Sequence, residues 1–214
     1  MDTSSAEYSV FFQALSRSDC DAIRAMGESR KKSPAEVSIA EQASRNLSFR
    51  DSEVAFLPLD SWVSGVMRHF IDTANAAKWT VPLSELQTLQ YAVYNVNGHF
   101  GWHQDGGEIN GAESYGAESE AAVPGFLRKL TAVLFLSDGA EYTGGDLEIR
   151  DARGNIHTDP RFRVAGTIVV FPSNLFHRVT PVLSGTRKTL ATWALGATNQ
   201  GLTREAACRR VRAE

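Results

Sequence analysis

The sequence has 214 residues, which fits one globular domain with or without a short helical prefix. Hydrophobic residues make up 43% of the chain and charged residues 22%, the proportions of a protein that buries a core. A net charge of −3 exerts no general attraction on nucleic acid or anionic lipid, so we expect neither a nucleic-acid partner nor a membrane.

The cysteines and the apolar runs bear on the compartment. Cys20 and Cys208 stand far apart in the sequence, without the CxxC spacing of a zinc ribbon. Two such thiols favour a reducing compartment over a disulfide scaffold. The first residues do not combine a basic segment with an apolar core, and no apolar run approaches the roughly 18 residues that a membrane-spanning helix needs. We therefore expect a cytoplasmic protein.

The first part of the chain shows helical periodicity. An apolar run at residues 10–12 predicts a short strand, and Ser16 can cap a helix in which Cys20, Ile23 and Met26 recur on one face. Residues 27–46 are polar and predict a solvated loop. A second helix is expected over about 60–78, with a core-facing stripe of Trp62, Val63, Val66, Met67, Phe70, Ile71 and Ala74. We expect residues 1–85 to form an N-terminal helical and strand support region of the same domain.

After Pro82 the pattern changes to short β-rich segments separated by glycine-containing turns. The predicted strands cover residues 88–96, 130–136, 146–150, 167–171, 177–181 and 189–195. Such a pattern favours a mainly β fold with flanking α-helices, in which two sheets form a barrel or jelly roll. We assign residues 86–196 to the β-rich core of the domain and residues 197–214 to a C-terminal helix or tail.

A long insert, residues 106–128, is rich in Gly, Ala, Ser and Glu. Loops of this length inside a compact domain usually have a function or lack fixed structure. We expect it to be mobile and to order over bound substrate, with Tyr115 or Phe126 closing the pocket. The alternative is a surface insertion without a role.

A His-x-Asp motif, formed by His103 and Asp105, follows a predicted strand. Residues i and i+2 of an extended chain share a face, so both side chains could point at one metal ion. His177 opens a later strand and could supply a third ligand. Two imidazoles and one carboxylate make the facial triad of non-haem iron(II), which leaves the opposite positions open. The alternative is that these polar side chains face water.

Arg187 begins the last predicted strand, ten residues after His177. A guanidinium group fits the two oxygens of a carboxylate, so Arg187 could bind a carboxylate-bearing co-substrate. Thr189 shares its face of the strand and could add a hydroxyl group to the same carboxylate. A surface ion pair is the alternative for Arg187. Tyr94 lies in the strand predicted over residues 88–96, where it could be a core aromatic residue.

Together these motifs resemble the 2-oxoglutarate oxygenases of the prolyl 4-hydroxylase type over residues 86–196. The upstream segment, residues 50–57, is similar to the bacterial PKHD-type branch. The resemblance is carried by the spacing of His103, Asp105, His177 and Arg187, by Tyr94, Gly98 and Phe100 ahead of the first ligand, and by residues 130–138 with the turn Gly144-Gly145 behind them.

The resemblance implies a double-stranded β-helix, the cupin-like jelly-roll barrel. It further implies that His103, Asp105 and His177 bind Fe(II), that Arg187 binds 2-oxoglutarate with Tyr94 and Thr189 as further contacts, and that ascorbate is a candidate reductant. Phe135 stands where some relatives carry a tyrosine hydroxyl for the same carboxylate, so that hydroxyl comes from Thr189 or is absent. The implied activity is a dioxygenase that hydroxylates a C–H bond and releases succinate and CO2.

The family-based expectation for the substrate is a peptidyl proline or another amino-acid-like group on a peptide or protein. A free amino acid or another small molecule, hydroxylated by the same mechanism, is the alternative. Two other classes could use the triad: a zinc hydrolase, and a non-catalytic β-barrel that binds a ligand or partner. Neither class requires the carboxylate clamp at Arg187, which discriminates against both. The oligomeric state is not predicted.

Overall fold

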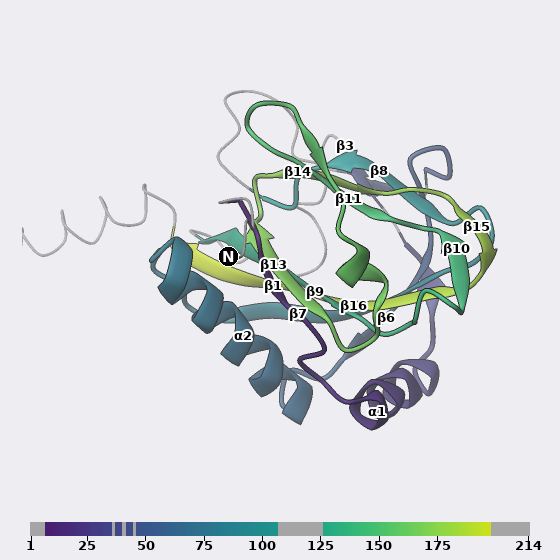
Figure 1. Cartoon of the computed structure of the whole chain (residues 1–214), viewed down its shortest axis with the longest axis horizontal. Coiled ribbons are helices and arrows are strands. Elements are labelled where there is room, and N and C mark those ends of the chain that lie inside the picture. Colours follow the sequence, from purple (N-terminus) through teal and green to yellow (C-terminus); the bar gives the residue numbers. More distant parts are fainter. Residues whose placement is uncertain (1–6, 36, 40–41, 45, 107–125, 198–214) are drawn as a thin grey trace, which may run out of the picture.

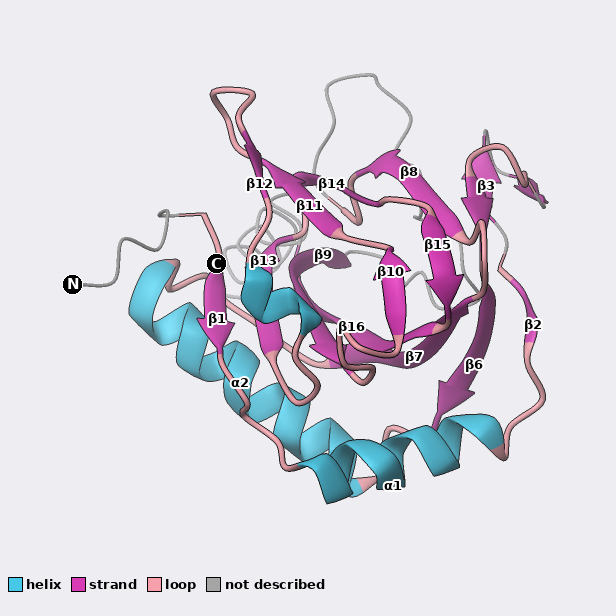
Figure 2. Cartoon of the chain, turned by 45° about the vertical axis from the view of Figure 1, so that its right-hand side comes forward, coloured by secondary structure: helices cyan, strands magenta, loops and turns pink. Residues whose placement is uncertain are grey.

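Two antiparallel β-sheets form the centre of the structure, a computed structural model that describes all residues except 1–6, 36, 40–41, 45, 107–125 and 198–214. The larger sheet has the order β1-β13-β9-β16-β7-β6-β2, and the smaller has the order β12-β11-β14-β8-β5. They face each other, and two α-helices cover the outer side of the larger sheet (Figures 1 and 2).

The larger sheet consists of β1 (Ser9–Phe11), β2 (Ser33–Pro34), β6 (Glu53–Leu57), β7 (Leu86–Tyr94), β9 (Phe126–Phe135), β13 (Ile168–Pro172) and β16 (Arg187–Ala197). The smaller sheet consists of β5 (Arg50–Asp51), β8 (His99–His103), β11 (Leu147–Arg150), β12 (Ile156–His157) and β14 (Phe176–Val179). Two further pairs are β3 (Val37–Ile39) with β4 (Gln42–Ser44) and β10 (Tyr142–Gly144) with β15 (Val182–Gly185). The helices are α1 (Arg17–Glu28), α2 (Trp62–Lys78) and the short 3₁₀ helix η1 (Pro160–Arg163).

The two helices are amphipathic and contribute to one core beneath the larger sheet. In α1 the Ser16 hydroxyl accepts from the Asp19 backbone N–H, and the Asp19 carboxylate accepts from the Ser16 N–H, which satisfies two free donors at the start of the helix. The α2 residues Val63, Met67 and Ile71 are fully buried against the sheet. Each such side chain contributes about 1.5–3 kcal/mol by leaving water. This core therefore stabilises the larger sheet by packing against its outer face.

The alternation of side chains along β16 separates this core from the interior between the sheets. Leu190 and Ala194 belong to the core under the sheet. Arg187, Thr189, Ala191 and Trp193 line a pocket on the opposite face. Because successive side chains of a strand point to opposite faces, the predicted shared face of Arg187 and Thr189 is confirmed. The larger sheet therefore presents polar residues toward the smaller one.

Both predicted helices and all the predicted strands are present, but β8, β10, β12 and β15 were not predicted, and the first part of the chain differs further. The helix predicted over 60–78 is α2, but Trp62 is 48% exposed and does not join the core, because it lies beside the buried row in the first turn. The prediction of a solvated loop over 27–46 is wrong in part. Helix α1 continues to Glu28, and β2 pairs with β6 at the edge of the larger sheet. A polar sequence does not prevent backbone pairing at a sheet edge.

The first 85 residues and the later strands share one sheet, because β1, β2 and β6 pair within it. The boundaries 1–85 and 86–196 therefore stay predictions about how the chain divides. The predicted C-terminal helix or tail falls almost entirely outside the described residues, as does most of the 106–128 insert, including Tyr115.

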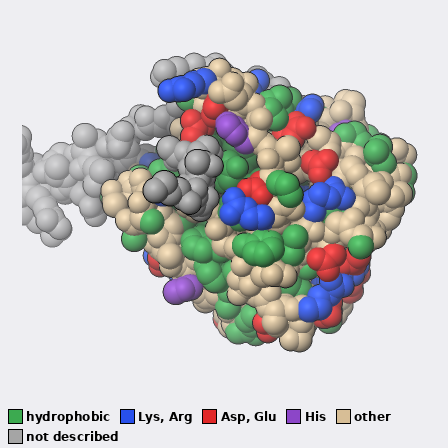
Figure 3. All heavy atoms as spheres, in the orientation of Figure 1, with side chains coloured by type: hydrophobic (Ala, Val, Ile, Leu, Met, Phe, Trp, Pro, Cys, Tyr) green, Lys and Arg blue, Asp and Glu red, His purple; other side chains and the backbone are tan. Residues whose placement is uncertain are grey.

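The surface offers no strong charge on the side that Figure 3 shows. Lys and Arg side chains alternate there with Asp and Glu side chains, in keeping with the net charge of −3 (Figure 3). Neither described α-helix has the length and apolar character needed to span a membrane.

Candidate metal centre

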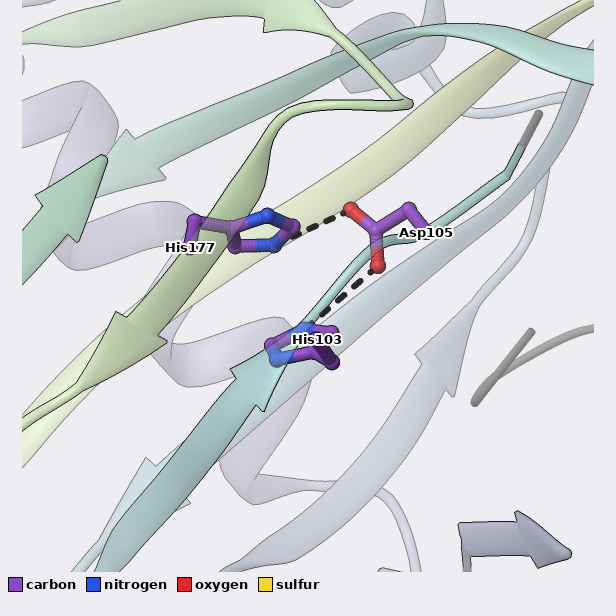
Figure 4. Close-up of side chains that lie close together, drawn as sticks. All are labelled: His103, Asp105 and His177. Atoms are coloured by element: carbon purple, nitrogen blue, oxygen red, sulfur yellow. Dashed lines mark ion pairs between the residues drawn. The ribbon is translucent and has the colours of Figure 1, made fainter. Parts of the chain in front are cut away.

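Three buried side chains converge at one end of the smaller sheet. His103 ends β8 and lies directly opposite His177 of the neighbouring strand β14, and Asp105 follows two residues after His103. One donor atom from each residue lies within 4.8 Å of the others (Figure 4). The strand register therefore brings a sequence-distant histidine to the His-x-Asp motif, which is the arrangement that the sequence predicted.

Backbone carbonyl groups orient both imidazoles. Nδ1 of His103 donates to the Gly101 carbonyl at 2.8 Å, and Nδ1 of His177 donates to the Leu175 carbonyl at 3.0 Å. Since a carbonyl only accepts, each Nδ1 must carry the proton, and each Nε2 is directed toward Asp105. The Nε2 atoms lie 3.6 Å and 3.3 Å from the two Asp105 carboxylate oxygens (Figure 4).

Burial and mutual proximity tune the charges of the three side chains. Burial, together with the nearby His177, lowers the pKa of His103 to about 3, so its imidazole is neutral at physiological pH. Burial opposes charge on Asp105, but the two imidazoles and Arg128 hold its pKa below the usual range. Burial likewise opposes protonation of His177, but the Asp105 carboxylate raises its pKa. Neutral imidazole nitrogen and ionised carboxylate are the forms that bind a metal ion.

Hydrogen bonds from the side of the larger sheet fix the Asp105 carboxylate. Thr131 in β9 donates to Asp105 Oδ2 at 2.8 Å and shares a hydrogen bond of 2.9 Å with the Ser173 hydroxyl. The Asp105 backbone N–H donates to the Ser173 carbonyl at 2.9 Å. All three residues are buried. These contacts fix the direction of the carboxylate, as outer partners of metal ligands commonly do.

Replacing Thr131 with Val should weaken divalent-metal binding about 10- to 100-fold, because it removes the donor that orients Asp105 without changing the side chain's shape. Titration with Mn(II), followed by calorimetry, measures the effect. Thr131→Ser keeps the hydroxyl and serves as the matched control. Equal Mn(II) affinities for Thr131→Val and the wild type would contradict this role.

Arg187 lies in the same interior as the triad and is 2% exposed. Its guanidinium carbon lies 5.1 Å from the centre of the Tyr94 ring and 5.6 Å from that of Phe135, and it forms no ion pair with a described residue. Its Nε has no hydrogen-bond partner within the described part of the chain. A buried guanidinium without an acceptor is costly and therefore calls for an anion.

The Gly144-Gly145 turn makes room for Arg187. Gly145 has a φ of +63°, and a Cβ atom at this position would lie 3.1 Å from Cδ of Arg187 and 2.9 Å from Cγ2 of Val182. A side chain there would be strained by the backbone conformation and would crowd the arginine. The glycine therefore belongs to the walls of the site.

The triad and Arg187 line one pocket between the sheets, with about 470 Å³ of empty space that is partly open to solvent. Tyr94 and Thr189 line it too, so the structure brings together all six residues that the sequence singled out for the site. Thr189 is buried and pairs with Phe135, which puts its hydroxyl-bearing side chain on the wall that carries Arg187. Their roles as ligands of metal and co-substrate stay predictions.

Trp102, next to the first ligand, faces away from the pocket. It packs against the guanidinium groups of Arg150 and Arg178, whose central carbon atoms lie 5.2 Å and 4.9 Å from its ring centre.

Phe126, one of the two residues expected to close the pocket, begins β9 and is 38% exposed.

Three pocket features were missed in the sequence. Thr131 stands in an apolar run, where a single hydroxyl is a weak signal, and only the strand register shows that it meets Asp105. Trp193 lines the pocket, and its buried Nε1 has no hydrogen-bond partner among the described residues, which the sequence does not indicate. Arg50 belongs to the segment 50–57, for which the sequence predicted no role in the site, and it lies on the wall of the pocket.

Comparison with known proteins assigns the family. The sequence profile of the 2OG-Fe(II) oxygenase superfamily matches residues 89–195, half of the chain. The chain therefore belongs to the 2OG-Fe(II) oxygenase superfamily, whose name implies Fe(II) and 2-oxoglutarate as metal and co-substrate. The buried His-Asp-His cluster and the arginine without an anion fit these two groups.

Relatives and solved structures support this assignment. A PKHD-type hydroxylase of Shewanella baltica is 39% identical over 88 residues, 39% of this chain and 38% of the relative. One of Xanthomonas axonopodis pv. citri is 35% identical over 118 residues, 55% of this chain and 46% of the relative. The chain thus spans less than half the length of these curated relatives.

Two prolyl hydroxylase structures share the fold. A Pseudomonas putida prolyl-4-hydroxylase gives a TM-score of 0.64 at 20% identity, covering 90% of this chain and 94% of that one. A Trichoplax adhaerens prolyl hydroxylase, in complex with a hypoxia inducible factor peptide fragment, gives 0.66 at 16% identity, covering 89% and 84%. The chain is therefore a double-stranded β-helix, as predicted.

Proposed function

We propose that this protein is an Fe(II)- and 2-oxoglutarate-dependent dioxygenase that hydroxylates a C–H bond of its substrate, with release of succinate and CO2. In this proposal His103, Asp105 and His177 bind iron. Arg187 binds the remote carboxylate of 2-oxoglutarate, and Tyr94 and Thr189 complete that end of the site. Ascorbate is the candidate reductant.

The observation that carries the proposal is the buried Arg187, which has an unpartnered Nε and shares one pocket with the triad. A hydrolase that uses the triad with zinc has no need of such an arginine, and neither has a binding protein. Because Arg187 and the triad line one pocket, a dicarboxylate held by the arginine at one end could contact the metal with the other.

Different groups of pocket residues would bind the metal and exclude water. When bound, Fe(II) and 2-oxoglutarate would together supply the electrons that activate O2. His103 and His177, oriented through their Nδ1 protons, and Asp105, oriented by Thr131, would hold the iron. Val133, Leu147 and Val179 line the pocket and keep water from the reacting groups.

We further propose an amino-acid-like substrate, either a residue of a peptide or protein or a small molecule. The family and the peptide complex of the Trichoplax enzyme support the first option. A cytoplasmic location is also proposed, supported by the buried free thiol of Cys20.

The direct test is an assay of succinate release from 2-oxoglutarate in the presence of Fe(II), run against libraries of peptides and metabolites. The proposal predicts basal succinate formation that a subset of compounds stimulates and that chelation of the metal abolishes. Metal-dependent hydrolysis of library members without any consumption of 2-oxoglutarate would instead indicate the zinc hydrolase. Absence of all turnover, with ligand binding retained, would indicate the binding protein.

A further inference from the structure

The pocket contains more positive charge than the metal and the co-substrate can balance. Arg50 and Arg187 line it, and Arg128 stacks its guanidinium carbon 3.9 Å from the ring centre of Trp193, another lining residue. Asp105 is the one acidic side chain among the described residues that line the pocket. The three arginines and Asp105 together leave a surplus of two positive charges.

Binding of iron and 2-oxoglutarate does not remove this surplus. Fe(II) carries two positive charges and 2-oxoglutarate two negative ones, so the pair is neutral, and histidines that bind a metal are neutral as well. Uncompensated charge in a desolvated site is costly. A further anion in the pocket would reduce this cost, and the primary substrate is the remaining ligand that can carry one.

Two of the three arginines already have an assigned ligand or hydrogen-bond partners. Arg187 is assigned to the remote carboxylate of 2-oxoglutarate. Arg128 donates from Nε to Gln87 Oε1 at 2.5 Å and from Nη1 to the Asp105 carbonyl at 3.4 Å, and its face is covered by Trp193. Burial lowers the pKa of Arg128 to about 10, so it remains charged at neutral pH. It supports the wall of the pocket rather than offering a free pair of donors.

Arg50 is different, because all of its close partners are neutral. It is 8% exposed and donates from Nε to the Ser52 hydroxyl at 3.0 Å, and the Tyr94 hydroxyl is its other polar partner. No carboxylate of the described residues lies within 4.0 Å of its nitrogens. Burial lowers its pKa, although Tyr94 and the charge of Asp105 raise it.

The position of Arg50 relates it to the reaction centre. It pairs with Phe100 across β5 and β8, and its guanidinium carbon lies 4.4 Å from the Phe100 ring centre. The same ring stacks on the His103 imidazole at 3.5 Å between centres. Arg50 is therefore separated from a proposed iron ligand by a single aromatic ring, on the same pocket wall.

We propose that Arg50 binds a carboxylate of the primary substrate, so that the enzyme acts on a carboxylate-bearing compound whose reacting C–H bond lies within a few bonds of that carboxylate. The inference rests on the proposed function and narrows it. A peptide-bonded proline offers no such group by itself. A free amino acid offers its α-carboxylate, and a peptide offers an Asp or Glu side chain.

The test compares matched acids and amides on the full chain loaded with Mn(II) and 2-oxoglutarate, which binds ligands without turnover. One set pairs free L-amino acids with their amides, such as L-proline with L-prolinamide and L-leucine with L-leucinamide. The other set pairs end-blocked peptides that contain Asp or Glu with the same peptides containing Asn or Gln. Calorimetry measures each affinity.

In one of the two sets the acid should bind at least about 30-fold more tightly than its amide. This ratio is the loss of affinity expected when a buried charged group lacks its partner. Arg50→Gln should abolish that preference, and Arg50→Lys should retain part of it, because lysine keeps the charge but loses the donor fork. Arg178→Gln is the matched control. Arg178 pairs with Glu148 on the outer face of β14, so its loss should leave the preference intact.

Equal binding of acids and amides in both sets, with normal 2-oxoglutarate affinity, would overturn the inference and leave the proposed function in place. So would an acid preference that survives in Arg50→Gln. Binding of 2-oxoglutarate to wild type and Arg50→Gln is titrated separately, and similar values show that the variant pocket is folded. Failure of the wild type to bind 2-oxoglutarate would overturn the proposed function together with the inference.

Discussion

Removing any one ligand of the triad should abolish Fe(II)-dependent turnover of 2-oxoglutarate while leaving the protein folded. His103→Ala, Asp105→Ala and His177→Ala each remove one of three donor atoms that lie within 4.8 Å of one another. The loss in metal affinity should exceed the roughly 10- to 100-fold that is typical for losing a partner that only orients a ligand. Succinate formation and Mn(II) titration measure the two effects.

The fold should survive these changes, because it is held by the apolar core beneath the larger sheet and not by the polar cluster. Far-UV circular dichroism and thermal unfolding check this point. His69→Ala, which removes a histidine from α2 outside the pocket, is the control and should behave as wild type. Wild-type turnover in a variant that combines His103→Ala, Asp105→Ala and His177→Ala would show that the metal binds elsewhere.

Arg187→Met should weaken 2-oxoglutarate binding by about 2–4 kcal/mol, or roughly 30- to 1000-fold, because the remote carboxylate would be desolvated without its partner. Arg187→Lys should have a smaller effect, since it keeps the charge and loses the fork. The 2-oxoglutarate dependence of succinate release, and calorimetry with Mn(II), provide the measurement.

Arg187→Met should also leave the ligand-free protein as stable as wild type or more stable, because the variant removes a buried charge that has no counter-ion among the described residues. For the 2-oxoglutarate titration the control variant is Lys188→Met, which changes the next residue of β16. Lys188 points to the other face of the strand, where it pairs with Glu28 at 2.7 Å. A 2-oxoglutarate titration that is unchanged in Arg187→Met would remove this residue from the site.

Periodicity predicted both α-helices and the long strands of the larger sheet, because apolar spacing reflects which side chains are buried. The buried row of Val63, Met67 and Ile71 appears in the sequence as helical spacing, and α2 follows it. The short strands β2 and β6 escaped prediction because pairing partners, not local patterns, create them. Ser33 pairs with Val54 at the edge of the larger sheet, and neither segment indicates this contact by itself.

The metal centre could be predicted because its chemistry requires particular residue types at particular places. A His-x-Asp pair, a later histidine and an arginine beyond it have few other uses in combination. The support of the site could not be predicted, because it depends on register. Thr131 reaches Asp105 only because β9 crosses behind the triad, and Arg50 reaches the pocket only because β5 pairs with β8 at Phe100.

The most direct test of the proposed activity is turnover of 2-oxoglutarate under ¹⁸O2, followed by mass spectrometry of the succinate. A dioxygenase that divides O2 between its two substrates places one ¹⁸O atom in the succinate carboxylate, and this labelling occurs even in slow turnover without the primary substrate. The protein with Fe(II) should give singly labelled succinate, and Asp105→Ala should give none. Succinate without label, or no succinate from the iron-loaded wild-type protein, would contradict the assignment of His103, Asp105, His177 and Arg187 to an oxygenase site.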